Sequence, residues 1–159
     1  MSLKGEKTMI SDEVARKMRI VESLSKELGD AITSIDYYIE DMGCPHKQPS
    51  SLPTGFSAVY MFVLENNDEY QFLKIGKANS KSQARFVSQH YGFSAQSSLA
   101  KSLYNDPEFN IDKENVKEWM LANLRRINIY IRSDCGKAVT ELVEAVMHYA
   151  FRPKYEGSI

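Results

Sequence analysis

The chain has 159 residues, of which 43% are hydrophobic, 11% aromatic and 26% charged, and its net charge is −1. This composition suffices for a folded domain with a hydrophobic core and excludes an intrinsically disordered chain. No apolar run approaches the roughly 20 residues that a membrane-spanning helix needs, and no secretory leader opens the sequence. We therefore expect a cytoplasmic protein. The net charge alone argues against a strongly electrostatic nucleic-acid binder.

The two cysteines, Cys44 and Cys135, are too few for a disulfide framework. Cys44 and His46 lie in the sequence Gly-Cys-Pro-His and could supply half of a metal site. A structural zinc site normally has four ligands, and no matching second pair follows downstream. We therefore expect two ordinary thiols and no zinc site.

Residues 11–39 show the pattern of an amphipathic helix that begins at Ser11, a suitable N-cap. The pattern predicts about eight turns, as one helix kinked at Gly29 or as two helices. Its apolar stripe needs a partner, either the domain that follows or a second copy of the chain, which would give a homodimer. The stripe consists of Val14, Met18, Val21, Leu28, Ile32, Ile35 and Ile39, interrupted by Ser25.

Residues 43–55 contain three prolines and two serines, which predicts a linker loop. The chain is thereby divided into an N-terminal helical arm with linker (1–54) and a domain (55–159). For the domain we expect an α/β (α+β) fold in which helices flank a small, mostly antiparallel three-stranded sheet. The predicted elements are hairpin strands at 56–64 and 69–76, helices at 79–91, 94–103 and 114–124, a strand at 125–132 and a helix at 137–151 that ends before Pro153.

The register of the predicted hairpin depends on its loop. A loop of three residues, Asn66–Asp68, or of five would place Tyr60 directly opposite Lys74. An ammonium group at that position would favour the phenolate and lower the pKa of Tyr60. The same face would pair Phe62 with Phe72 and Leu64 with Tyr70, and the core face would carry Val59, Met61, Val63, Gln71, Leu73 and Ile75.

The segment from Tyr70 to Asn105 contains no aspartate or glutamate, whereas acids gather in residues 106–118. A locally basic surface on a protein of neutral net charge suits the binding of phosphate groups. A solvated surface that happens to lack acids would give the same pattern. The basic residues of the segment are Lys74, Lys77, Lys81, Arg85 and Lys101.

Four short motifs follow one another in the region of residues 55–157. They are Ala58-Val59-Tyr60, then Lys74-Ile75-Gly76-Lys77-Ala78, then Arg85, and finally Glu144-Ala145-Val146-Met147-His148-Tyr149-Ala150-Phe151-Arg152-Pro153-Lys154-Tyr155. In their order and in the elements that carry them, they resemble the motifs of the GIY-YIG nuclease superfamily. Each motif is weak alone, but together they form a fairly specific pattern.

The resemblance implies a metal-dependent endonuclease that hydrolyses phosphodiester bonds of DNA. Tyr60 would act as general base or orient the attacking water, and Glu144 alone would hold Mg²⁺ or Mn²⁺. Without the resemblance, Tyr60 would be taken for a core tyrosine and Glu144 for a surface acid. The implied catalytic residues are Tyr60, Lys74, Arg85 and Glu144, and the expected nucleic-acid contacts are Lys77, Lys81, His90 and Lys101.

The chain departs from the family pattern at two positions. Lys74 replaces the tyrosine of the second motif, and Glu156 replaces the asparagine that closes the pattern. The lysine form is similar to a branch with DNA-binding members, so the alternative function is a catalytically impaired DNA-binding module. A third alternative is an interaction domain whose helical arm is the active part. His90 is out of phase with Arg85 on the predicted helix and could instead pack beside Tyr91.

Overall fold

The computed structural model describes residues 9–29 and 35–156. Its centre is a four-stranded sheet in the order β1-β4-β2-β3, in which every neighbouring pair is antiparallel. The strands β1 and β3 therefore form the two edges. The strands are β1 (Tyr37–Gly43), β2 (Phe56–Asn66), β3 (Glu69–Ala78) and β4 (Leu124–Arg132).

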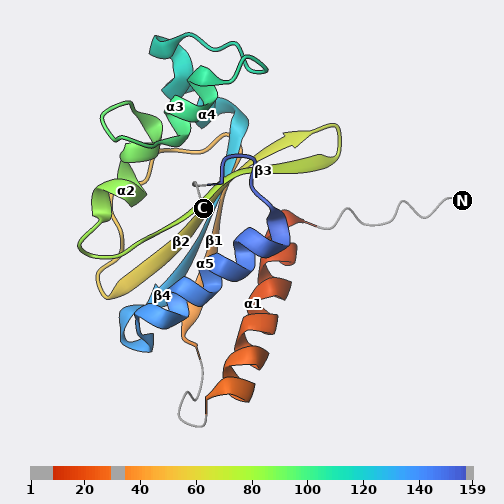
Figure 1. Cartoon of the computed structure of the whole chain (residues 1–159), viewed down its shortest axis with the longest axis vertical. Coiled ribbons are helices and arrows are strands. Elements are labelled where there is room, and N and C mark those ends of the chain that lie inside the picture. The colour runs from red at the N-terminus through yellow and green to blue at the C-terminus, as the bar shows by residue number, and fades with distance from the viewer. Residues whose placement is uncertain (1–8, 30–34, 157–159) are drawn as a thin grey trace, which may run out of the picture.

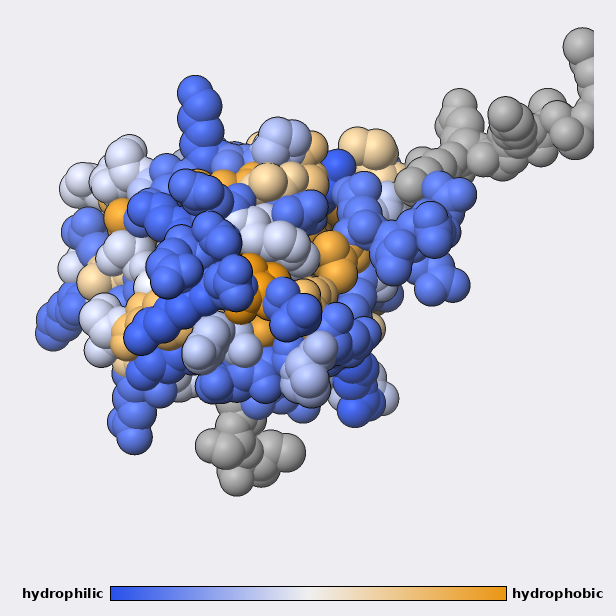
Figure 2. All heavy atoms as spheres, turned by 90° about the horizontal axis from the view of Figure 1, so that it is seen from above, coloured by the Kyte–Doolittle hydropathy of each residue, from blue (hydrophilic) through white to orange (hydrophobic). Residues whose placement is uncertain are grey.

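Helices cover both faces of this sheet (Figure 1). α1 and α5 pack on one face, and α2, α3 and α4 pack on the other. Within the described ranges, no helix combines the length and apolarity needed to cross a membrane. The surface seen from the end of α3 and α4 is mainly hydrophilic, with small separate hydrophobic areas (Figure 2). The helices are α1 (Ile10–Leu28), α2 (Gln83–Val87), α3 (Leu99–Asn105), α4 (Val116–Asn123) and α5 (Lys137–Phe151), with 3-10 turns η1 (Gln89–Tyr91), η2 (Lys113–Asn115) and η3 (Ser133–Cys135).

The structure confirms a mixed fold of helices and an antiparallel sheet, but the sheet has four strands rather than the predicted three. The additional strand, β1, begins at the end of the segment 11–39 that was predicted to be helical. Ile35 and Ile39 are four residues apart, and this spacing fits one face of a strand as well as one face of a helix. The aromatic and β-branched residues of Tyr37–Ile39 favour the strand. The predicted stripe position Ile32 lies outside the described residues.

The apolar stripe of α1 packs against its own chain. Val14, Met18 and Val21 are fully buried and belong to one hydrophobic cluster with α5 and the sheet. The apolar stripe of α1 is thus covered by the domain that follows it in the same chain. The homodimer stays a prediction. On the outer side of α1, Ile20 and Leu28 are exposed.

The hairpin of β2 and β3 is confirmed, but the predicted register is wrong. The loop has two residues, Asn67 and Asp68, both with positive φ, as in the tight turns that suit twisted hairpins. A bulge at Leu73 then shifts the pairing, so Tyr60 lies opposite Gly76. Lys74 lies opposite Phe62 instead of Tyr60.

The bulge decides which side chains share a face of the sheet. Because the extra residue compensates for the shorter loop, Tyr60 and Lys74 still point to the same face, as expected. Leu73 and Phe72 exchange the faces predicted for them. Leu73 packs with Tyr60 on the α2 side, and Phe72 packs with α5, where its ring stacks on Phe151.

The helical segments after the hairpin are shorter than predicted, and the later elements are close to their predicted positions. Asn79 and Ser82 bond to each other's backbone and side chain, which competes with helix formation before α2. The predicted helix at 94–103 is helical only from Leu99, where the Ser98 hydroxyl caps α3 by accepting from the Lys101 amide at 3.2 Å. α4, β4 and α5 confirm the predictions for 114–124, 125–132 and 137–151.

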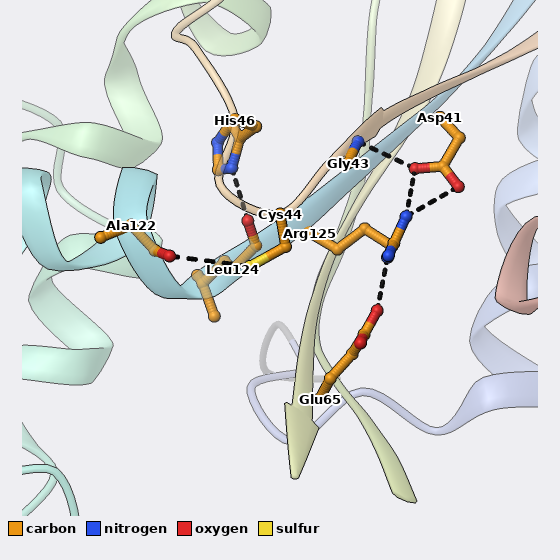
Figure 3. A network of polar contacts seen from close by, with 8 residues as sticks. All are labelled: Asp41, Gly43, Cys44, His46, Glu65, Ala122, Leu124 and Arg125. Atoms are coloured by element: carbon orange, nitrogen blue, oxygen red, sulfur yellow. Dashed lines mark hydrogen bonds and ion pairs between the residues drawn. The ribbon is translucent and has the colours of Figure 1, made fainter. Parts of the chain in front are cut away.

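One arginine connects three strands at the end of the sheet beside the linker (Figure 3). Arg125 on β4 donates from Nη1 to both carboxylate oxygens of Asp41 on β1, at 2.8 and 2.9 Å. Its Nε donates to Glu65 on β2 at 2.5 Å. All three side chains are less than one-third exposed, so the contacts are weakly screened by solvent.

We expect Arg125→Ala to lower the free energy of unfolding by about 1–3 kcal/mol, because two partly buried carboxylates lose their shared donor. Urea unfolding measures the change. The control is Arg132→Ala, which removes an arginine of the same strand whose contact to Asp134 is 3.6 Å long and exposed. Equal effects of the two substitutions would contradict a structural role for the Arg125 network.

Candidate active site

The four residues that the motifs single out as catalytic come together in one pocket. Tyr60 on β2, Lys74 on β3, Arg85 on α2 and Glu144 on α5 line a pocket of about 690 Å³. Tyr60, Lys74 and Arg85 come from three consecutive elements, and Glu144 comes from a helix much later in the sequence. The other lining residues are Ile75, Gly76, Lys77, Gln89, His90, Ala95, Gln96, Ser97 and His148.

The pocket lies at the edge of the sheet formed by β3. Tyr60 packs in the cluster on the α2 side, whereas α5 belongs to the layer on the opposite side. Residues of both layers can meet because β3 is an edge strand and no further strand separates them. His148 fixes α5 to this edge, since its Nε2 donates to the Ile75 carbonyl at 3.0 Å. The edge position of β3 thus explains how Glu144 reaches the same pocket as Tyr60.

Gly76 provides the space in which the Tyr60 ring lies. A Cβ atom at Gly76 would be 2.5 Å from the Tyr60 hydroxyl and 2.7 Å from its Cζ. Carbon atoms do not approach this closely, so a side chain at Gly76 would displace the phenol ring. The glycine of the second motif is therefore required by packing against the tyrosine directly opposite.

A hydrogen-bond chain fixes the proton positions at Tyr60. The Leu99 amide donates to Nδ1 of His90 at 3.2 Å, so Nδ1 carries no hydrogen. In a neutral imidazole the hydrogen then sits on Nε2, which lies 2.6 Å from the Tyr60 hydroxyl oxygen. His90 therefore donates to Tyr60, and the hydrogen of the phenol points away from His90.

Burial controls the protonation of this pair. Tyr60 is 1% exposed, and burial raises its pKa above the ordinary value of about 10. Arg85 and Arg126 oppose this shift. Burial also lowers the pKa of His90 to about 3, with further contributions from Lys74 and the two arginines. The predicted lowering of the Tyr60 pKa by Lys74 is therefore wrong: burial outweighs the cations, and Arg85 and Arg126 are the cations that act on the phenol.

Two cations face the pocket without a bonded partner. Lys74 is half-buried, and burial lowers its pKa, while the nearby Glu144 opposes this shift. Arg85 is exposed. Within the described ranges, neither side chain forms a hydrogen bond or an ion pair. Two unpaired cations beside a neutral phenol create a site that favours an anion, such as a phosphate group.

Glu144 is the carboxylate that could anchor a divalent cation in this pocket. Its side chain is 24% exposed, and its Oε1 lies 3.6 Å from the Lys77 ammonium. The described part of the chain contains no group of three or more histidine, cysteine or acidic side chains that could enclose a metal. Mg²⁺ commonly binds through one or two carboxylates together with substrate phosphates. Glu144 therefore fits a cation that the substrate helps to hold, and not one bound by protein ligands alone.

The residues predicted to contact nucleic acid have different environments. Lys77 lines the pocket but is 3.6–3.8 Å from Glu144 and Glu141. Lys81 is exposed and lines a neighbouring pocket. The Lys101 ammonium does not line either pocket; it donates to the carbonyls of Ala95 and Gln96, and so holds the loop at the rim.

His90 lies inside the pocket and is 6% exposed. The structure thus places it beside Tyr60, as a hydrogen-bond donor to the phenol rather than as a surface residue that contacts nucleic acid.

His46, considered above as half of a metal site with Cys44, has both ring nitrogens in hydrogen bonds. Its Nδ1 donates to the Leu124 carbonyl at 2.6 Å, and its Nε2 accepts from the Tyr91 hydroxyl at 2.8 Å (Figure 3 shows the first contact).

The sequence prediction did not include Arg126, which lies behind the pocket and is fully buried. Its guanidinium donates to the Phe86 carbonyl at 2.7 Å and to the Tyr91 hydroxyl at 3.0 Å. The guanidinium carbon lies 5.3 Å from the centre of the Tyr60 ring. The sequence of β4 did indicate a polar position inside the sheet. Side chains alternate between the two faces of a strand, so Arg126 shares a face with Asn128, and Ile127 lies on the other face.

No protein-family model matches the chain, and no curated protein or solved structure matches it significantly. The relation to the GIY-YIG superfamily is therefore a proposal that rests on the motifs and on the pocket they form.

The low pKa of His90 predicts a specific dependence of stability on pH. Between about pH 6.5 and pH 3 the unfolded chain binds a proton at His90 that the folded chain does not, so stability falls as the pH falls. We expect wild type to lose roughly 2 kcal/mol more than His90→Gln between about pH 6.5 and 4.5. Urea unfolding across this range measures both proteins, and parallel curves would contradict the buried neutral imidazole.

Proposed function

We propose that the protein is a divalent-metal-dependent endonuclease that hydrolyses phosphodiester bonds of DNA. The observation that carries the proposal is the meeting of Tyr60, Lys74, Arg85 and Glu144 in one pocket. Tyr60, Lys74 and Arg85 lie on consecutive elements, whereas Glu144 comes from α5 in the opposite layer, so its place in the same pocket is the strongest support from the arrangement. A phenol, two unpaired cations and one carboxylate supply the groups that phosphodiester hydrolysis requires.

In the proposed reaction, the phenolate form of Tyr60 accepts a proton from the water that attacks the phosphorus atom and becomes the neutral phenol. The Nε2–H of His90, 2.6 Å from the phenol oxygen, stabilises this phenolate before it takes up the proton. Arg85 and Lys74 bind the non-bridging oxygens of the phosphate and stabilise the charge that develops on them. A cation held by Glu144 would supply Lewis-acid stabilisation of the phosphate and of the leaving oxygen.

The alternative function is a DNA-binding module that no longer cleaves. Burial raises the pKa of Tyr60, which disfavours the phenolate that a general base needs. Lys74 and Arg85 would still bind a phosphate group in that case. Location in the cytoplasm and the homodimer through the N-terminal helix stay predictions.

Cleavage of supercoiled plasmid separates the two functions. With Mg²⁺ or Mn²⁺ we expect nicking by wild type, no nicking in EDTA, and rates at least about 100-fold lower for Tyr60→Phe, Arg85→Ala and Glu144→Gln. Each variant loses one reacting group while the others stay in place. The matched control for Glu144→Gln is Glu118→Gln, an exposed acid of α4 that does not line the pocket.

Two outcomes would contradict the nuclease. If wild type shifts DNA on a gel but nicks it with neither metal, the binding module is correct. If the three variants nick as fast as wild type, the reaction takes place elsewhere on the protein.

The general-base role of Tyr60 predicts the pH dependence of the rate. Because burial raises the pKa of the phenol, the phenolate fraction is small at neutral pH and grows with pH. The single-turnover rate should therefore rise about tenfold per pH unit between roughly pH 7 and 9. A rate independent of pH over this range would assign Tyr60 a role other than proton acceptor.

A further inference from the structure

A second pocket of about 310 Å³ adjoins the candidate active site. The two pockets share Lys77 and Arg85, so a ligand can extend from one into the other. The second pocket lies where the turn after β3 meets the start of α5. Its other lining residues are Ser57, Ala78, Asn79, Ser80, Lys81, Ser82, Ser133, Lys137, Thr140 and Glu141.

The lining of this second pocket is predominantly basic and hydroxylic. Lys81 and Lys137 add two positive charges to the two shared with the active site, against the single carboxylate of Glu141. Lys137 is 82% exposed and lies 3.6 Å from Glu141, so its ammonium can reorient toward a ligand at little cost. The pocket thus carries a net positive charge.

Thr140 provides a hydroxyl group that lacks a partner. It lines the pocket and is only 7% exposed, yet its side chain forms no hydrogen bond with any part of the chain that the structure describes. Among the described residues, no buried side-chain oxygen or nitrogen lacks a hydrogen-bond partner, so the Thr140 hydroxyl must be open to solvent in the pocket, where it can donate to a ligand. Thr140 lies in the first turns of α5, a helix of 15 residues whose N-terminus has no side-chain cap. The free amide groups there favour an anion.

The opposite wall of the pocket is held in shape by its own hydrogen bonds. The Asn79 side chain accepts from the Lys81 amide, and the Ser82 hydroxyl accepts from the Asn79 amide, both at 2.9 Å. This turn carries Lys81 and leads into α2, which carries Arg85. The geometry of the wall therefore exists before a ligand binds, which lowers the entropic cost of binding.

We propose that this second pocket binds the phosphate group next to the scissile one on the same DNA strand. The proposal rests on the proposed function, because it takes the first pocket as the place of the scissile phosphate. Lys81 and Lys137 contact the neighbouring phosphate by charge, and Thr140 donates a hydrogen bond to one of its oxygens. Since these contacts go to the backbone, they position the strand without reading its sequence.

The two kinds of contact predict different effects on DNA binding. Binding of a fluorescein-labelled duplex to the full chain is followed by anisotropy in EDTA, between roughly 50 and 200 mM salt. Lys137→Ala should lower the slope of log K against log salt by about 1, because one phosphate contact is lost. Thr140→Val should weaken binding roughly tenfold with an unchanged slope, because a hydrogen bond is lost and no charge.

The controls distinguish binding at the second pocket from general attraction between DNA and positive charges, and from misfolding of the variants. Lys117→Ala removes the same charge from an exposed site on α4 that lines neither pocket, and should leave affinity and slope unchanged. Thr140→Ser keeps the hydroxyl and should restore wild-type affinity. Thermal unfolding of the variants checks that each is folded.

The outcomes distinguish this proposal from the function on which it rests. Equal slopes for Lys137→Ala and Lys117→Ala, or wild-type affinity of Thr140→Val, would overturn the second phosphate site. If Lys74→Ala still weakens binding in that case, the first pocket and the proposed function stand. Failure of wild type to bind the duplex would overturn both.

Discussion

The candidate site depends on a positive charge that is buried in the middle of the protein. Arg126 is completely inaccessible, and within the described residues it forms no ion pair. An isolated buried charge is costly unless its donors are bonded. Here Nε donates to Asn128 at 3.0 Å, while the two terminal nitrogens donate to Tyr91 and to the Phe86 carbonyl. The ring of Phe86, 4.6 Å from the guanidinium carbon, adds a cation–π contact.

These bonds connect the sheet to the segment that carries much of the site. Phe86 directly follows Arg85, and Tyr91 directly follows His90, so the bonds of Arg126 fix both neighbours relative to β4. α2 has only five residues and could not hold its position by helix formation alone. The same charge also opposes the rise of the Tyr60 pKa caused by burial. One guanidinium therefore contributes both to the position of the site and to its electrostatics.

The sequence alone predicted the hairpin, the final helix and the residues that meet in the pocket, since motif order and hydrophobic alternation are local properties. It did not predict the register, because neither glycine nor proline stands at Leu73 or beside it to mark the bulge. It did not predict β1, where a spacing of four residues fits a strand and a helix equally well. The importance of Arg126 depends on contacts with residues 35–40 positions earlier in the chain, which no local pattern reveals.

We propose that the pocket at the edge of β3 receives a phosphate group of nucleic acid. The most direct test is a crystal structure of Glu144→Gln with a short DNA duplex and Mg²⁺, in which cleavage should be blocked. We expect a backbone phosphate in contact with Lys74 and Arg85 and close to the Tyr60 hydroxyl. Duplex bound to another face, with these three side chains unchanged and facing solvent, would contradict it.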